Sequence, residues 1–251
     1  MLLLVTDTSG REGFVGLARA GEGADLNQVE VIEEVPLAGG TFSAQLVPQI
    51  AGLLNEHGFR KTDVDAFIVV SGPGSFTGLR VGLAAIKALA EILHKPIVAI
   101  SLLEVIARSS ISVAGQAEDA SEARYTVALD ACRGEAFVGQ FKMSFTGNTI
   151  HSFVCEGESL RTVQSLAELV QSGATPWIVT PDAVLGDVLK QRLDTAKKKA
   201  ILSYARPHSA EVAGVGWHKL KAGETVSPEQ LEANYIRVSD AEIFVKPATS
   251  S

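Results

Sequence analysis

A tight junction between a strand and a helix constrains this chain more than any other segment. The apolar run at 66–70 predicts a buried strand, and Ser-Gly-Pro-Gly-Ser-Phe-Thr-Gly-Leu-Arg follows it at 71–80. Apolar residues at helical spacing then predict a helix over 77–93. Glycine and proline make such a junction a sharp turn, while the unpaired N–H groups of a helix start can bind an anion. The junction is therefore either a rigid turn capped by Ser75 or Thr77, or an anion-binding loop.

The anion interpretation has candidate residues but no complete motif. The junction lacks the Lys-Ser/Thr ending of a P-loop and the three-glycine spacing of a dinucleotide fingerprint. The candidate nucleotide or anion contacts are small or hydroxyl-bearing residues at this junction, together with three residues of the first hairpin: Asp7, Thr8, Ser9, Gly72, Gly74, Ser75 and Thr77. We therefore keep nucleotide contact as the secondary interpretation of this loop.

Composition narrows the class of protein. The 251 residues are 46% hydrophobic and 20% charged, which is typical of a folded chain with a large core. No apolar run reaches membrane-spanning length and the first residues lack a basic signal region, so we expect a cytoplasmic protein without membrane contact. The net charge of −7 argues against unaided nucleic-acid binding, and only Lys197, Lys198 and Lys199 form a basic run.

Cysteine and histidine spacing gives no metal or redox motif. Cys132 and Cys155 are too far apart for a CxxC pair, and no two of the five histidines stand at the i, i+4 spacing of a zinc-binding helix. We therefore predict no metal site, no catalytic residue and no cofactor that this chain binds by itself.

Hydrophobic patterning predicts a meander followed by alternating helices and strands. In the first half we expect strands at 2–7, 13–20, 29–37, 65–70 and 96–100, and helices at 43–57, 77–93 and 102–109. A strand, a long helix and a further strand make a parallel βαβ unit. The polar stretch at 114–123 then predicts a linker or long loop.

The opening of the chain recurs after this linker. Residues 2–19 align without a gap on 125–142, and five positions are identical: Asp7 with Asp130, Glu12 with Glu135, Phe14 with Phe137, Val15 with Val138, and Gly16 with Gly139. Further strands are expected at 149–155, 177–180 and 200–203, and helices at 160–171, 183–193 and 209–220. A duplicated α/β domain follows, with domains at 1–110 and 111–251. We expect the helix at 209–220 to pack back on the first domain.

Two facing domains, each with an acidic hairpin tip, follow the plan of the actin-like ATPase superfamily. We therefore expect two tandem actin-like, ribonuclease-H-like domains, each a mixed sheet flanked by helices. The glycine junction, Leu-Asp-Ala-Cys-Arg-Gly-Glu at 129–135 and Asn-Tyr-Ile-Arg at 234–237 resemble one branch closely. That branch is the TsaB (YeaZ) family, and the resemblance spans nearly the whole chain.

The resemblance implies a non-catalytic scaffold in tRNA modification. Proteins of this family pair with a TsaD homologue, which transfers threonylcarbamoyl to the adenosine beside the anticodon, and a TsaE homologue joins them. The resemblance thus implies partners of both kinds, a homodimer in isolation, tRNA held only through the complex, and ATP or ADP only within the assembled complex.

A small actin-like phosphotransferase or nucleotide hydrolase is the alternative. Such an enzyme needs a phosphate-binding hairpin in each domain, but the turn at 130–133 lacks the hydroxyls of the turn at 7–10. Asp7 and Asp130 either cap their own turns or hold a ligand. Family members often have histidine where this chain has Phe42, which cannot bind a metal.

The expected partner surface lies on the helices at 43–57 and 77–93. Glycine and alanine give the second helix a smooth face on which another helix could pack closely. Arg80 is either a solvated charge or the partner of a carboxylate on another protein. The candidate interface residues are Phe42, Leu46, Gly78, Arg80, Gly82 and Ala85. The junction itself then serves as the rigid corner that sets the second helix for docking.

Overall fold

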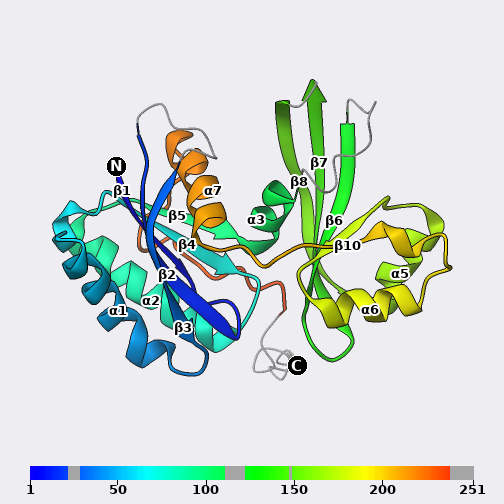
Figure 1. The fold of residues 1–251 in the computed structure, drawn as a ribbon, viewed down its shortest axis with the longest axis horizontal. Coiled ribbons are helices and arrows are strands. Elements are labelled where there is room, and N and C mark those ends of the chain that lie inside the picture. The colour runs from blue at the N-terminus through cyan, green and yellow to red at the C-terminus, as the bar shows by residue number, and fades with distance from the viewer. Residues whose placement is uncertain (22–28, 111–121, 147–148, 238–251) are drawn as a thin grey trace, which may run out of the picture.

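The computed structural model describes residues 1–21, 29–110, 122–146 and 149–237. They form two five-stranded mixed sheets with helices on both faces (Figure 1). The first sheet has the order β3-β2-β1-β4-β5 and the second has the order β8-β7-β6-β9-β10. The two sheets therefore repeat one topology, as the duplicated sequence pattern predicts.

The first half contains the meander and the βαβ unit at nearly the expected positions. β1 pairs antiparallel with β2 and parallel with β4, which itself pairs parallel with β5. Its elements are β1 (Leu2–Asp7), β2 (Glu12–Arg19), β3 (Glu30–Ala38), α1 (Phe42–Glu56), η2 (Lys61–Asp63), β4 (Ala66–Gly72), α2 (Phe76–Leu93), β5 (Ile97–Ser101) and α3 (Leu102–Ser109).

The second half repeats this order with longer hairpin strands. Its elements are β6 (Glu122–Asp130), β7 (Glu135–Thr146), β8 (Thr149–Thr162), α5 (Val163–Ser172), β9 (Ile178–Thr180), α6 (Ala183–Gln191), η3 (Lys198–Ala200), β10 (Ile201–Ser203) and α7 (Ser209–Lys221). The helix expected from residue 160 begins only at Val163, because Leu160 still pairs with Phe137 and the Thr162 side chain caps the helix. Most of the loop expected at 114–123 lies outside the described residues.

The strand pairing corrects the gapless alignment of the two halves. Asp7 stands opposite Phe14 in the first hairpin, whereas Leu129 stands opposite Phe137 in the second. The match of β2 with β7 is therefore consistent with the structure, but β1 and β6 are displaced by one residue. Because side chains alternate along a strand, Asp7 and Asp130 lie on opposite faces of their sheets.

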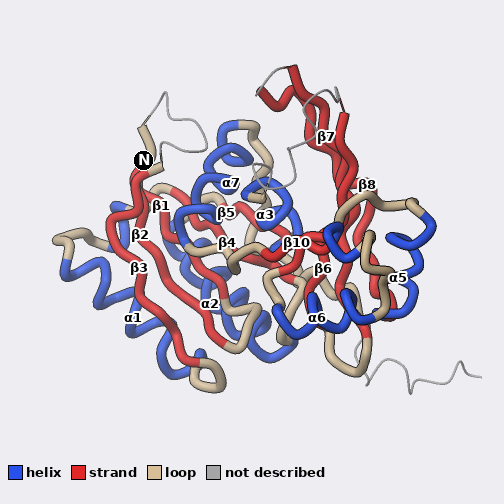
Figure 2. Tube along the Cα trace, turned by 45° about the vertical axis from the view of Figure 1, so that its right-hand side comes forward, coloured by secondary structure: helices blue, strands red, loops and turns tan. Residues whose placement is uncertain are grey.

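Two helices cover the outer face of each sheet. α1 and α2 pack on the first sheet over a core that includes Leu4, Leu46 and Ile86. α5 and α6 pack on the second sheet over Val138, Leu166 and Leu189. Figure 1 shows these helix pairs at opposite sides of the molecule, and in Figure 2 α1 and α5 lie toward opposite edges of the view.

The two halves exchange their third helices across the middle of the molecule. α7 follows the second sheet but lies on the inner face of the first, where a Cβ at Gly216 would come within 2.5 Å of Ile68. α3 follows the first sheet but contacts the second, where a Cβ at Gly139 would lie 3.2 Å from Leu103. One continuous core therefore joins both sheets, and it includes Val5, Ile68, Leu103, Tyr125, Val127, Val212 and Val215.

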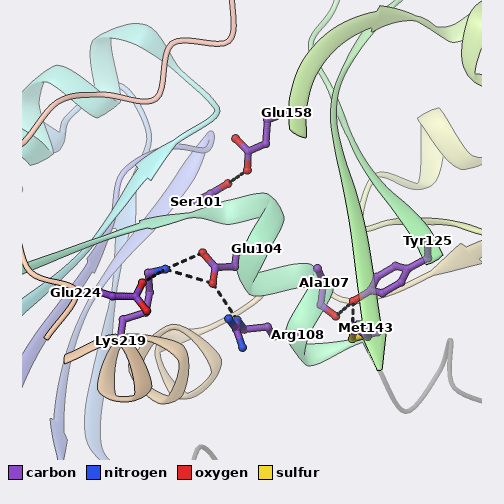
Figure 3. Close-up of polar contacts among 9 residues, drawn as sticks. All are labelled: Ser101, Glu104, Ala107, Arg108, Tyr125, Met143, Glu158, Lys219 and Glu224. Carbon is purple, nitrogen blue, oxygen red and sulfur yellow. Dashed lines mark hydrogen bonds and ion pairs between the residues drawn. The ribbon is translucent and has the colours of Figure 1, made fainter. Parts of the chain in front are cut away.

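Polar contacts reinforce this exchange (Figure 3). Glu104 of α3 accepts a hydrogen bond from Arg108 at 2.9 Å and pairs with Lys219 of α7 at 3.2 Å. The hydroxyl of Tyr125 in β6 donates to the carbonyl of Ala107 in α3. Leaving a polar group unpaired away from water is costly, so these contacts favour one position of α3 between the two sheets.

Glu34 of β3 holds the first residues of α7. One of its carboxylate oxygens accepts the backbone N–H of Ser209 at 2.7 Å, and the other pairs with His208 Nδ1 at 2.9 Å. The hydrogen bond to Glu34 raises the pKa of His208. Burial raises the pKa of Glu34, but the hydrogen bonds from Ser209 and His208 outweigh it and hold the pKa below its ordinary value.

We expect Glu34→Gln to destabilise the chain in a pH-dependent way. The ion pair is complete at about pH 5–6, where Glu34 is ionised and His208 is protonated in both the folded and unfolded states. Its contribution is lost as pH rises through the raised pKa of His208, and also in acid as Glu34 is protonated. The difference in unfolding free energy between wild type and variant, measured by urea titration, should therefore shrink between about pH 6 and 8, by about 0.5 kcal/mol for so exposed a pair.

The His208→Ala background is the control for this experiment. There the effect of Glu34→Gln should be constant between pH 6 and 8, because only the bond from Ser209 remains. An equal loss at pH 6 and pH 8.5 in the wild-type background would contradict the ion-pair account.

Candidate functional site

The glycine junction, Ser71 to Arg80, forms a corner that joins β4 to α2. Ser75 is the N-cap of α2, and its hydroxyl accepts the backbone N–H of Gly78 at 3.3 Å. The N–H of Ser75 itself donates to the carbonyl of Ser9 at 2.7 Å. The corner is therefore a capped turn, as one of the two sequence interpretations holds, and it is bound to the turn of the first hairpin.

Glycines at every fourth position let this hairpin turn lie directly on α2. A Cβ at Gly74 would come within 2.1 Å of the Ser9 carbonyl oxygen. A Cβ at Gly78 would lie 2.1 Å from the Thr8 carbonyl oxygen, and one at Gly82 would lie 2.2 Å from Thr8 Oγ1. These glycines are required because any side chain would displace the hairpin.

The smooth face predicted for a partner is therefore covered by the chain itself. Gly78 and Gly82 are buried beneath Thr8, so the expectation that they present an open surface is wrong. Phe42 and Leu46 are also buried, because they lie on the side of α1 that faces the core. The Phe42 ring fills the space between the hairpin and α2, 3.2 Å from where a Cβ at Gly13 or Gly78 would lie.

The polar groups of the first hairpin are paired with each other and with the second half of the chain. Asp7 is 1% exposed, and its carboxylate accepts the N–H of Ser9 at 2.7 Å. Arg206, between β10 and α7, places Nη2 at 3.3 Å from the other oxygen of Asp7 and at 2.9 Å from Ser9 Oγ. The two predicted contacts Asp7 and Ser9 thus bind an internal guanidinium. Sequence reasoning missed Arg206, because no local pattern connects it with residue 7.

The second hairpin repeats the turn but not this closure. The N–H of Cys132 donates to Asp130 at 2.9 Å, just as the N–H of Ser9 donates to Asp7. Both aspartates therefore cap their own turns, which was one of their two predicted roles. The N–H of Asp130 donates to Asp182 at the start of α6, and Cys132 and Arg133 adopt positive φ angles of 62° and 56°.

The late motif at 234–237 closes the glycine corner from the other side. The N–H of Asn234 donates to the Ser71 carbonyl at 2.8 Å, and a Cβ at Gly72, whose φ is 132°, would lie 2.9 Å from the Asn234 carbonyl oxygen. The Asn234 side chain donates to Glu158 of β8, which also accepts a hydrogen bond from Ser101. Two motifs more than 150 residues apart therefore form one structure across both halves.

Arg80 is engaged within the chain rather than solvated alone. Its guanidinium lies 3.7 Å from the centre of the Phe76 ring, and its Nε donates to the Tyr235 hydroxyl at 3.2 Å. The Phe76 and Tyr235 rings are 4.9 Å apart. Thr77 is exposed in the first turn of α2. Arg80 and Ala85 remain partly or fully accessible on α2.

An apolar groove opens on the outer side between α1 and α2. Its volume is about 60 Å³. Its lining residues are Leu4, Val47, Ile50, Ala51, Leu54, Lys61, Val64, Phe67, Leu89 and Leu93. Val47 at its rim is 50% exposed, and Ile92 in the last turn of α2 is 74% exposed. The floor of the groove, which includes Leu4 and Phe67, is buried, so Val47 and Ala51 supply its exposed apolar surface.

No candidate metal centre is found in the described part of the chain. No three histidine, cysteine, aspartate or glutamate side chains gather there in a way that could hold an ion. His57 and His208 instead pair with Glu33 and Glu34, respectively. Within the same ranges, no helix is both long and apolar enough to cross a bilayer.

Comparisons with known proteins agree with this geometry. A family model described as TsaD, tRNA N6-adenosine threonylcarbamoyltransferase, matches residues 36–242. Over 243 residues the chain is 24% identical to the tRNA threonylcarbamoyladenosine biosynthesis protein TsaB of Bacillus subtilis (strain 168), and the match covers 96% of both chains. It is 32% identical to the TsaB protein of Haemophilus influenzae over 140 residues, 56% of this chain and 53% of that protein.

A solved structure extends the agreement to the fold. It is described as an uncharacterized protein with similarity to peptidase YEAZ from Pseudomonas aeruginosa, and it superimposes with a TM-score of 0.69 at 25% identity, covering 94% of this chain and 99% of that chain. The repeated sheet topology and this structural likeness define a two-domain actin-like protein. The chain belongs to the TsaD (tRNA N6-adenosine threonylcarbamoyltransferase) family, and within it to the TsaB (YeaZ) group.

The glycines beneath the hairpin generate the first prediction from this site. Gly78→Ala should destabilise the chain by about 1–3 kcal/mol, because the new Cβ meets a backbone carbonyl that cannot rotate away. Gly52→Ala in α1 is the matched control, since nothing lies within 4 Å of its Cβ position, and it should be neutral or stabilising by up to about 1 kcal/mol. Urea unfolding measures both, and equal effects of the two substitutions would contradict the packing account.

The contact of Arg206 with Asp7 and Ser9 leads to a second prediction. Arg206→Ala should cost about 2–3 kcal/mol, because it leaves the buried carboxylate of Asp7 without its cation. Adding Asp7→Asn should recover part of this loss, because the buried charge is then removed. Thermal and urea unfolding of the single and double variants would measure the coupling. Strictly additive losses would show that the two side chains do not interact.

Proposed function

We propose that this chain is a non-catalytic subunit that binds a TsaD homologue and activates threonylcarbamoyl transfer to the adenosine beside the anticodon of tRNA. The observation that carries the proposal is the closed hairpin: Asp7 and Ser9, which would face a phosphate in an actin-like kinase, are bound to Arg206. The relatives named TsaB and the family model named for TsaD supply the reaction and the partner.

The partner surface that we propose is the apolar groove between α1 and α2. Val47 and Ala51 are exposed at this groove beside the half-buried Leu89, and apolar side chains form the buried centre of protein interfaces. We propose that Arg80 and Ala85 lie at the edge of this contact. In isolation the same groove binds a second copy of the chain, since a symmetric contact buries the same patch on both copies.

The remaining components follow the same proposal. A TsaE homologue joins the assembly, tRNA is held only through the complex, and ATP or ADP binds only within it. The proposed setting is the cytoplasm. A small phosphotransferase or nucleotide hydrolase is the alternative, and it predicts ATP turnover by the purified chain that Asp7→Asn abolishes.

Reconstitution tests the proposed function directly. Purified TsaD and TsaE homologues from the same organism should modify tRNA much faster with this chain than without it, measured as threonylcarbamoyl incorporation. The purified chain by itself should not hydrolyse ATP. Modification at an unchanged rate without the chain would contradict the proposal.

The groove generates a further prediction. Val47→Asp should weaken binding to the TsaD homologue more than tenfold, because an unpaired carboxylate is costly to bury in an apolar contact. Val184→Asp is the matched control, since Val184 is 77% exposed on α6 in the other half. Calorimetry or analytical gel filtration measures both, and equal binding by the two variants would place the interface elsewhere.

A further inference from the structure

We infer that the Arg80 guanidinium, held in place by Phe76 and Tyr235, is a preassembled binding site for a carboxylate side chain of the TsaD homologue. The three residues are called the Arg80 cluster below. This inference rests on the proposed function and deepens it, because it assigns the chemistry of one contact and gives Phe76 and Tyr235 the role of positioning residues.

The Arg80 cluster fixes the orientation of a surface cation. The guanidinium carbon of Arg80 lies 3.7 Å from the centre of the Phe76 ring, and Nε donates to the Tyr235 hydroxyl at 3.2 Å. The two rings are 4.9 Å apart, and Phe76 is 36% and Tyr235 42% exposed, so the stack stands at the surface. One face of the guanidinium is therefore stacked and its Nε edge is bonded.

The rest of the guanidinium is open to a ligand. Arg80 is exposed, and no carboxylate in the described part of the chain lies within ion-pair distance of it. Its two Nη groups carry four of the five guanidinium N–H donors, and within the same ranges they have no acceptor. Parallel N–H bonds from such a fork match the two oxygens of a carboxylate. The cluster thus presents an oriented cation without an internal counter-ion in these ranges.

The backbone on both sides of the cluster is anchored in the fold. The Ser75 side chain caps α2 directly before Phe76. The N–H of Asn234, next to Tyr235, donates to the Ser71 carbonyl at 2.8 Å. Groups that are already ordered lose little conformational freedom when they bind, which favours affinity.

The outward face of α2 continues the contact surface beyond Arg80. Ala84, Ala88 and Ile92 follow at four-residue spacing and are all exposed, Ile92 by 74%. Residues four apart are neighbours on a helix surface, so an apolar line runs from Arg80 to the far end of α2. Leu89 of the same helix lines the groove. A protein that covers both the groove and this line would meet Arg80 at its rim, where the polar contacts of an interface are made.

These surroundings favour a protein carboxylate over a phosphate as the anion. The chain carries a net charge of −7, which repels a nucleic acid or a polyphosphate. A phosphate would gain nothing from the apolar line beside Arg80, whereas a folded partner would remove that line from water. The occupant is therefore an aspartate or glutamate of the TsaD homologue.

Calorimetry with the TsaD homologue, in the absence of nucleotide and tRNA, tests the inference. Arg80→Ala should raise the Kd about tenfold or more. Arg80→Lys should raise it too, because an ammonium has no planar fork. Tyr235→Phe removes only the hydroxyl that holds Nε and should raise the Kd about two- to fivefold.

Arg124→Ala is the matched control. Arg124 is an arginine of β6 in the other half, its side chain is 64% exposed, and its replacement should leave the Kd unchanged. Thermal unfolding of all these variants should stay close to that of the wild type, because the replaced atoms lie at the surface. Weaker binding would then reflect the contact itself rather than a loss of folding.

Charge reversal identifies the carboxylate. Arg80→Glu should weaken binding more than Arg80→Ala, and among the exposed aspartates and glutamates of the homologue, replaced by arginine one at a time, one should restore it. An absence of restoration by every reversal would overturn the inference. A loss of affinity seen only with ATP or tRNA present would overturn it too, because the anion would then be a phosphate.

The two proposals fail in different ways. An unchanged Kd for Arg80→Ala, beside a wild-type chain that still binds and activates its partner, would overturn this inference alone. Failure of the wild-type chain to bind the TsaD homologue would refute the proposed function, and the assignment of Arg80 would fall with it.

Discussion

The exchange of α3 and α7 between the two sheets is the interaction on which the rest of the structure depends. α7 of the second half covers the inner face of the first sheet, and α3 of the first half lies between the two sheets and contacts both. Ile68 in the first sheet is covered by Gly216 of α7, and Gly139 in the second lies beneath Leu103 of α3. The halves therefore share one core, and the loop before α7 brings Arg206 to Asp7. Closure of the hairpin is a consequence of this exchange.

The packing of the glycine corner is a second consequence of the exchange of α3 and α7. Its glycines admit the hairpin on one side and Asn234 on the other, so its backbone contacts two distant segments of the chain. A phosphate bound at this corner would need open donors, whereas here the N–H of Ser75 donates to the Ser9 carbonyl and the Arg206 guanidinium donates to Ser9 Oγ and Asp7. The same fold that closes this site leaves the apolar groove between α1 and α2 accessible at Val47.

Sequence patterns predicted much of the fold because strands and helices depend on nearby residues. The meander, the βαβ unit and the repeat of both in the second half follow from periodicity and turn residues alone. The sequence-based predictions failed where contacts between distant segments determine the local structure. Leu160 extends a strand because Phe137 stands opposite it, and Gly78 and Gly82 are buried because the hairpin turn lies on them.

Local chemistry alone predicted two related α/β halves. It offered a corner capped by Ser75 or Thr77, and two self-capped aspartate turns, each as one of two interpretations. These depend on hydrogen bonds and spacings within a few residues. The partner of Asp7, the burial of Phe42 and the meeting of Tyr235 with Arg80 required the folded molecule. Arg206 and Tyr235 reach the first half only after the chain has passed through the second sheet and returned, and no local spacing records that path.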